Sequence, residues 1–181
     1  MNALDLGVIA ITHVNDHDEE SISPAKHGES FAARKKRVRQ ELIAAGMTPY
    51  GLSKFNTRYL TSIIKEGEHI HGVVYGRHVE GPGFLSWVDR MIVATDHRII
   101  SFNHKPGYTD DDEITYDVVN GVDSSNAWPF TAVTLDTRIG KVTLRFVRNR
   151  CAAIFIEYVE RRRVEFFKTR THRDLQQKEG F

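Results

Sequence analysis

Residues 87–103 read WVDRMIVATDHRIISFN. Two runs rich in β-branched and apolar residues flank a short polar break at Thr95-Asp96-His97, and such runs favour β-strands. The Asp96 carboxylate can accept backbone hydrogen bonds at the first position of a turn, so strand pairing can resume at once. The stretch therefore predicts two antiparallel strands, Trp87–Thr95 and Arg98–Asn103, joined by a tight turn.

Similar runs lie on both sides of this pair, from Gly67 onward. They are separated by the turn-forming breaks Gly81-Pro82-Gly83, Lys105-Pro106-Gly107 and Arg138-Ile139-Gly140. The further predicted strands are His69–Val79, Glu113–Tyr116, Phe130–Asp136 and Lys141–Val147. Because the breaks are short and no crossover helix intervenes, the pattern predicts an antiparallel meander that folds into a barrel or sandwich of six to seven strands.

Residues before these strands have helical spacing. Ser30 is a suitable N-cap and Gly46 a suitable stop, which predicts a helix over 31–45. Its apolar stripe consists of Phe31, Val38, Leu42 and Ala45. A second helix is expected to begin at Thr48-Pro49 or at Ser53 and to end at Gly67. Its stripe consists of Phe55, Tyr59, Leu60, Ile63 and Ile64. The two form a helical hairpin that needs an apolar surface to cover, and the β-domain is the expected support.

Helical spacing returns after the last predicted strand. Ala152, Phe155, Ile156 and Val159 lie at i, i+3, i+4 and i+7, which predicts a helix that begins near Arg150 and turns Phe155 inward. The sequence thus predicts a mainly β, overall α+β, fold. An antiparallel barrel is capped by a C-terminal helix and preceded by a helical hairpin.

Three short motifs accompany this element order. Gly67-Glu68 precedes the first strand, Thr95-Asp96-His97-Arg98-Ile99-Ile100 links two central strands, and the pattern Ile114-x-Tyr116-x-x-Val119-x-x-Val122 follows. Together they resemble the bacterial pleckstrin-homology-like (PH-like) family of the YokE-like kind, over roughly residues 63–163. The resemblance implies a PH-like barrel and domains that can assemble through strand edges. Thr95, Asp96 and Arg98 are interpreted as a folding signal, because their roles in a turn are structural.

Charge is segmented along the chain, although the formal net charge is only +1. Residues 1–30 hold six acidic residues and one basic residue, whereas residues 31–65 hold eight basic residues and one acidic residue. We predict a flexible acidic leader at 1–30 and a helical extension at 31–65. A PH-like domain at 66–165 and a basic C-terminal tail at 166–181 would complete the chain.

Several functional classes lack the residues that they require. The apolar stretch Leu6–Ile11 is too short for a signal peptide and has no basic flank, and no run reaches the length of a membrane span. The single Cys151 cannot form an internal disulfide, so a cytoplasmic location is expected. Neither a glycine-rich phosphate loop nor a recognisable Ser, His and Asp grouping is present. We therefore expect no catalytic residues and no cofactor.

Metal sites are also not expected. Two histidine groups have ligand-like spacing, namely His69 with His71, and His13 with His17 and Glu20. Zinc sites need three or four ligands, and neither group supplies a convincing set. The acidic run Asp110–Glu113 lacks the alternating ligands and the glycine of a calcium loop, so it is interpreted as a hydrated turn. Cys151 is expected to be a buried thiol on a helix stripe and not a nucleophile.

The strongest charge feature is Arg34-Lys35-Lys36-Arg37-Val38-Arg39. This run could contact an anionic partner through Arg34, Lys35, Lys36, Arg37 and Arg39, or it could be a solvated helix face. Four further contact candidates lie near the ends of strands, namely Arg77, His78, His104 and Lys105. They are too few and too close to acidic residues to bind phosphate groups well, so lipid recognition is not expected.

Three functions stay open at this point. The favoured one is a non-enzymatic binding or assembly module that contacts protein partners, including copies of itself. The first alternative is a binder of anionic surfaces, such as nucleic acid or a membrane, through residues 34–39. The second is an enzyme with an unrecognised site. The preference depends on the missing catalytic constellation and on the family resemblance.

Overall fold

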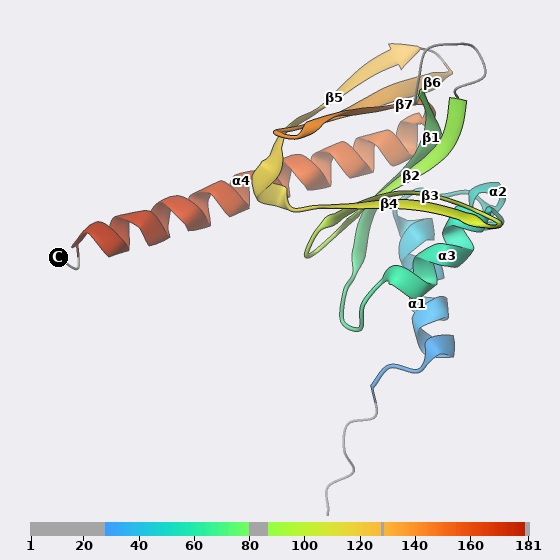
Figure 1. The fold of residues 1–181 in the computed structure, drawn as a ribbon, viewed down its shortest axis with the longest axis horizontal. Coiled ribbons are helices and arrows are strands. Elements are labelled where there is room, and N and C mark those ends of the chain that lie inside the picture. Colours follow the sequence, from blue (N-terminus) through green and yellow to red (C-terminus); the bar gives the residue numbers. More distant parts are fainter. Residues whose placement is uncertain (1–27, 80–86, 128, 180–181) are drawn as a thin grey trace, which may run out of the picture.

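The computed structural model describes residues 28–79, 87–127 and 129–179. Most of the predicted acidic leader therefore lies outside the described residues, as do His13, His17 and Glu20. Within the described ranges the chain forms seven strands, four α-helices and one short 3-10 helix (Figure 1).

The strands form one antiparallel sheet in the order β4-β3-β2-β1-β7-β6-β5. Their bounds are β1 Ile70–Val79, β2 Trp87–Thr95, β3 Ile99–Lys105, β4 Tyr108–Ile114, β5 Val119–Ala127, β6 Phe130–Thr137 and β7 Gly140–Arg148. The sheet bends where β1 meets β7, two strands that pair at Arg77 and Arg145 (Figure 1). The two halves, β1–β4 and β5–β7, consequently enclose a core. The predicted PH-like barrel is confirmed.

The two edge strands of the sheet differ from the sequence-based prediction, which placed one strand at Glu113–Tyr116 and none at Val119–Ala127. The acidic run Asp110–Glu113 is not a hydrated turn, because it lies in β4 and pairs along β3. Three of its four carboxylates bind arginines: Arg90 of β2 binds Asp110 and Asp112, and Arg98, in the turn before β3, binds Glu113. The end of the predicted strand Glu113–Tyr116 is a 3-10 helix, η1 Tyr116–Val118, which leads into β5.

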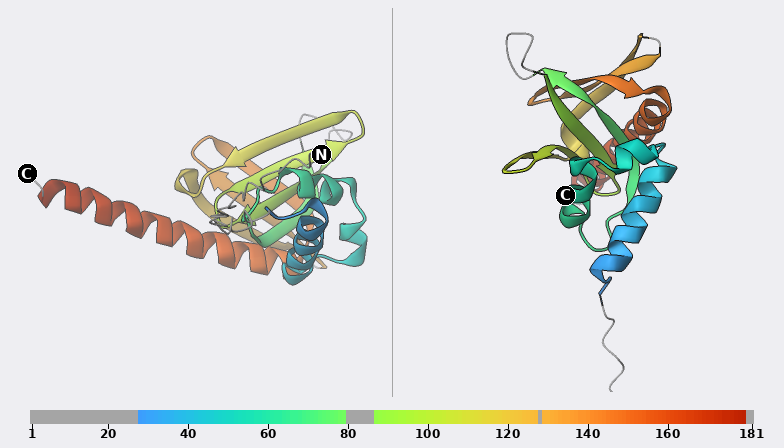
Figure 2. Two further views of the ribbon diagram at one scale, coloured as in Figure 1. Left: turned by 90° about the horizontal axis from the view of Figure 1, so that it is seen from below. Right: turned by 90° about the vertical axis from the view of Figure 1, so that its right-hand side faces the viewer.

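The C-terminal helix α4, Asn149–Glu179, covers the opening between the two halves of the sheet. Phe155 is fully buried, as predicted. Gly72 in β1 allows close contact, because a Cβ at that position would lie 3.0 Å from the Cα of Phe155. The helix then continues past the sheet, so that residues of the predicted basic tail prolong it up to Glu179 (Figures 1 and 2).

The N-terminal helices cover the outer face of β1–β3 (Figure 2). α1 spans Phe31–Ala44, with the Ser30 side chain accepting a hydrogen bond from Ala33 N at 3.2 Å. Gly46 ends it with a φ of 92°. The predicted start at Thr48-Pro49 is confirmed, because Thr48 caps the short helix α2, Pro49–Leu52. The second start, Ser53, instead ends α2, and α3 spans Phe55–Ile63 after Lys54, so it ends four residues before the predicted stop at Gly67.

The helices and the outer face of the sheet share a second hydrophobic core. It contains Val38, Leu42, Ala45, Met47, Leu60, Ile64, Ile70, Val73, Met91, Val93, Ile100 and Phe102. The expected support of the helical hairpin by the β-domain is thus confirmed. Among the stripe residues whose side chains the structure describes, Phe31 is an exception, because its side chain stays 63% exposed.

Candidate functional site

The basic run on α1 divides between two faces of the helix. Arg37 faces the body of the protein, where its guanidinium donates two hydrogen bonds of 2.8 Å to the carboxylate of Glu29 and one of 2.7 Å to the carbonyl of Glu68. Arg34 lies on the same face and reaches Glu29 at 3.5 Å. These contacts hold the chain before α1 against the helix. Arg34 and Arg37 are therefore structural, and the predicted five-residue contact surface is not continuous.

The pKa values agree with this role for Arg37. Its hydrogen bonds to Glu29, followed by those to Glu41, raise the pKa of the Arg37 guanidinium despite partial burial. The hydrogen bonds from Arg37 likewise lower the pKa of the Glu29 carboxyl group. Both groups stay ionised at neutral pH, and their charges compensate each other.

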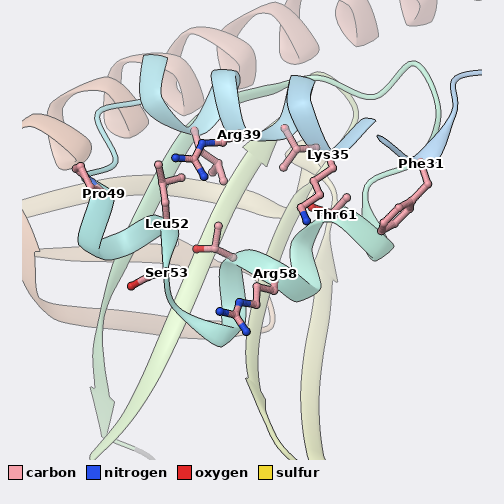
Figure 3. Close-up of a pocket in the computed structure, with 11 residues that line it drawn as sticks. Phe31, Lys35, Arg39, Pro49, Leu52, Ser53, Arg58 and Thr61 are labelled. Atoms are coloured by element: carbon pink, nitrogen blue, oxygen red, sulfur yellow. The ribbon is translucent and has the colours of Figure 1, made fainter. Parts of the chain in front are cut away.

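The other face of α1 lines a groove of about 730 Å³ between α1 and the pair α2–α3 (Figure 3). The α1 wall consists of Phe31, Lys35, Val38, Arg39 and Leu42. These residues recur at helical spacing, so they form one stripe. The opposite wall consists of Pro49, Leu52, Ser53, Thr57, Arg58 and Thr61. The groove thus exists only because the two helical segments pack side by side.

The groove combines an apolar floor with cations. Val38 and Leu42 are buried at its base, and Phe31 and Leu52 extend the apolar surface. The hydroxyl of Ser53 donates to Tyr50 O at 2.7 Å, and that of Thr57 donates to Gly51 O at 2.8 Å. These two donors are therefore already used.

Lys35 and Arg39 lie four residues apart and are exposed. Neither forms an ion pair with any residue in the described ranges. Arg58 adds a third cation from α3. Such a surface can bind a ligand that is apolar on one side and negatively charged on the other.

The predicted contact residues near the strand ends are not part of this groove. Arg77 lies in β1 and pairs with Asp89 at 3.7 Å, and His78 Nδ1 donates to Thr143 O at 3.0 Å. His104 stacks on Tyr59, with ring centroids 4.2 Å apart. Lys105 is exposed at the end of β3. These four residues therefore form no common anion site.

The Thr95-Asp96-His97-Arg98 turn connects several elements. Thr95 Oγ1 accepts hydrogen bonds from His97 N and Arg98 N, as expected of a turn residue. Asp96 instead accepts from His69 N at 3.0 Å, which ties the turn to the start of β1. The Arg162 guanidinium of α4 donates to Asp96 O at 2.6 Å, so this side chain contributes to packing although it lies off the apolar stripe.

Arg98 extends these connections through a buried ion pair. Its guanidinium donates to both carboxylate oxygens of Glu68 at 2.8 and 3.0 Å and to the carbonyl of Ile63 at 3.1 Å. The Glu68 side chain is only 3% exposed. Burial raises the pKa of the Glu68 carboxyl group, but hydrogen bonds from Arg98, Lys65 N and Thr95 outweigh it, so the pKa lies below the usual value. The turn is a structural junction.

The other candidates also have structural surroundings. His69 Nδ1 lies 2.8 Å from Glu41 Oε1, whereas His71 stacks on Tyr158 at 4.5 Å, so the two histidines do not converge. Within the described residues no group of three metal-ligating side chains occurs. Cys151 is buried, and burial raises the pKa of its thiol, which disfavours the thiolate needed by a nucleophile.

The sequence singled out only two of the eleven residues that line the groove as contact residues. Lys35 and Arg39 were in the predicted contact set, whereas Phe31, Leu52 and Arg58 were not recognised as part of a site. The spacing of Phe31, Lys35 and Arg39 at i, i+4 and i+8 was the available signal. The partner wall could not be found this way, since the packing angle between helices is a tertiary property.

Comparisons with known proteins concern the fold. A family model described as Bacterial PH domain matches residues 64–161. No curated protein is significantly similar to the chain. One similar solved structure is the crystal structure of the C-terminal domain of an unknown protein from Leishmania infantum. It has a TM-score of 0.36 and 18% identity, and covers 46% of this chain and 75% of that chain. No helix in the described part of the chain is long and apolar enough to span a membrane.

Proposed function

The chain belongs to the bacterial PH domain family, and on that premise we propose that it is a non-enzymatic binding module for proteins. Its groove between α1 and α2–α3 would hold an acidic, amphipathic segment of a protein partner. The observation that supports this proposal is the apolar floor of the groove beside the exposed cations Lys35 and Arg39. We place the module in the cytoplasm, because its single cysteine is free and buried.

A protein segment fits these features better than nucleic acid or a membrane. Phe31, Pro49 and Leu52 offer accessible apolar surface to leucine-like side chains, which an anionic polymer does not possess. Arg34 and Arg37 are occupied by Glu29, so the basic run offers fewer charges than its sequence suggests. Only a few phosphate contacts would remain, and each contributes little at physiological salt.

Titration with a synthetic peptide tests the proposal. The peptide would carry leucines on one helical face and glutamates on the other, and binding would be followed by fluorescence anisotropy. We expect the double variant Lys35→Glu/Arg39→Glu to bind at least tenfold more weakly. Exposed ion pairs contribute about 0.2–1 kcal/mol each, and two reversals that turn attraction into repulsion approach the 1.4 kcal/mol of a tenfold change.

The matched control is Lys36→Glu/Lys168→Glu, which changes the net charge equally. Both residues are exposed and neither lines the groove, so affinity should stay within twofold of the wild type. Equal losses in the two double variants would reduce the effect to overall charge and contradict the proposal.

Parallel titrations with duplex DNA and with anionic phosphatidylserine vesicles test the alternative partners. Binding of either that is tighter than peptide binding would favour the anionic-surface function.

Self-association is the second part of the proposal. Beyond the sheet, α4 carries Val164, Phe166 and Phe167, each 43–45% exposed. β4 and β5 are the edge strands of the sheet, and family resemblance favours assembly through edges. A second copy would cover these apolar side chains. Residues 66–147 hold twelve acidic and seven basic residues, so the barrel of that copy would also attract the basic end of α4.

A further inference from the structure

We propose that in the free chain the groove is occupied by the chain's own residues 6–20, so that a partner must displace this segment. The inference rests on the proposed function, since it names the resident occupant of the same groove. Residues 6–20 lie outside the described ranges, and their sequence is LGVIAITHVNDHDEE.

The composition of this segment complements the groove. Its first part, Leu6–Ile11, is almost wholly apolar, which suits the accessible apolar surface of Phe31, Pro49 and Leu52. Its last part, Asp16–Glu20, holds four carboxylates, which suit the cations Lys35, Arg39 and Arg58. Over residues 1–27 the chain has five acidic residues and one basic residue. The same two properties that define the proposed partner are therefore present in the chain itself.

The described chain delivers this segment to one end of the groove. Glu29 N donates to Glu66 Oε1 at 2.9 Å, and the Glu29 carboxylate binds Arg37 through both oxygens. These contacts fix Glu29 beside Arg37, on a different face of α1 from the one that lines the groove. Only two residues further, Phe31 lines the groove with its exposed ring (Figure 3). The segment is thus attached at the end of α1 where the groove begins, and it would pass from the Arg37 face of the helix to the groove face.

The connection is long enough for residues 6–20 to reach the whole groove. α1 has 14 residues, which corresponds to a length of about 21 Å at 1.5 Å per residue. Residues 21–27 can span about 23 Å when extended, at roughly 3.3 Å per residue. Because the tether is short, its local concentration near the groove is on the order of millimolar. Even a weakly complementary segment would then compete with an external partner.

Photocrosslinking of the full chain tests occupancy directly. Ser53, an exposed residue on the groove wall, is replaced by benzoylphenylalanine, and crosslinked peptides are identified by mass spectrometry. We expect crosslinks to residues 1–27 of the same chain. Lys35→Glu/Arg39→Glu should lower their yield at least threefold, whereas Lys36→Glu/Lys168→Glu should leave it unchanged. Mixed heavy and light chains separate crosslinks within one chain from those between copies.

A second measurement on the full chain does not depend on crosslinking chemistry. Neutralising the segment by Asp16→Asn/Asp18→Asn/Glu19→Gln/Glu20→Gln should raise the affinity for the leucine and glutamate peptide at least threefold, because the internal competitor is weakened. Unchanged affinity, missing crosslinks to residues 1–27, or crosslinks only between copies would each overturn the inference. The proposed function would fail separately, if peptide binding did not depend on Lys35 and Arg39.

Discussion

Glu68 and Arg98 illustrate how single residues hold this fold together. Their side chains are only 3% and 8% exposed, and they join the end of α3, the start of β1 and the turn before β3. A buried ion pair adds little stability by itself, since two charges must leave water. Removing one partner lowers the free energy of unfolding strongly, because the remaining charge stays buried without compensation.

The first prediction concerns the loss of stability when one partner of the Glu68–Arg98 pair is removed. Glu68→Gln keeps the shape of the side chain but removes its charge, and Arg98 then retains only Glu113 as an acidic partner. We expect unfolding free energy to fall by about 3 kcal/mol, measured by urea denaturation. The control is Glu113→Gln, since the Glu113 side chain is 57% exposed and water can replace its contact at a cost below about 1 kcal/mol. Similar losses in the two variants would contradict the assigned role.

The second prediction gives the pH dependence of this contact. The pKa of Glu68 is lower in the folded protein than its ordinary value of 4.5, so folding favours the ionised form. The resulting stabilisation is present above pH 4.5 and is lost as the pH falls through the folded pKa. The difference in unfolding free energy between wild type and Glu68→Gln should therefore be largest near neutral pH and shrink below pH 4.5. A constant difference down to about pH 3 would show that this ionisation is not coupled to folding.

Among the secondary-structure elements, the regular spacing of apolar residues was sufficient to predict most helices and the central strands. β1, β2 and α1 begin within one residue of their predicted starts, because their apolar positions recur strictly and their turns contain glycine, aspartate or serine. The edge strands were harder to predict from the sequence. β4 contains three consecutive aspartates, and β5 ends in the polar run Asp123–Asn126. Both are strands because of pairing with β3 and β6, which a local pattern cannot report.

The third prediction tests the register of α4. Phe155→Asp puts a carboxylate at a fully buried position beside Gly72. Loss of the aromatic ring costs about 3–5 kcal/mol and burial of an unpaired charge adds to it, so most of the variant should be unfolded. Ala153→Asp introduces the same residue two positions earlier on an exposed site and should cost about 1 kcal/mol or less. Thermal melting followed by circular dichroism decides between them, and equal melting temperatures would refute the register.

For the whole molecule, the sequence predicted individual residues of the groove but not the groove that they line. Lys35 and Arg39 were identified as exposed cations, but Arg37 was placed in the same surface. Its contacts with Glu29 and Glu68 involve chain segments 8 and 31 residues away. A charge pattern along one helix cannot show which side faces the protein unless the partners are known.

The fourth prediction concerns self-association. Light scattering of the full chain over a concentration series, at low and high salt, should show a mass that rises with concentration and falls with salt. Val164→Glu/Phe166→Glu should shift the chain toward the monomer, because it removes apolar surface that a second copy would cover. Thr169→Glu, on an exposed part of the same helix, should have little effect. A monomer under every condition would refute assembly.

The core that α1–α3 share with the sheet also has an evolutionary consequence. Val73, Val93, Ile100 and Phe102 on the outer face of β1–β3 are buried only because the helices cover them. A relative that lost residues 31–65 would expose four large apolar side chains on a sheet, which promotes aggregation. Mutation would then favour polar residues at these strand positions. We expect the helical segment and the outward-facing apolar residues to be inherited together, and PH domains without the helices to be polar there.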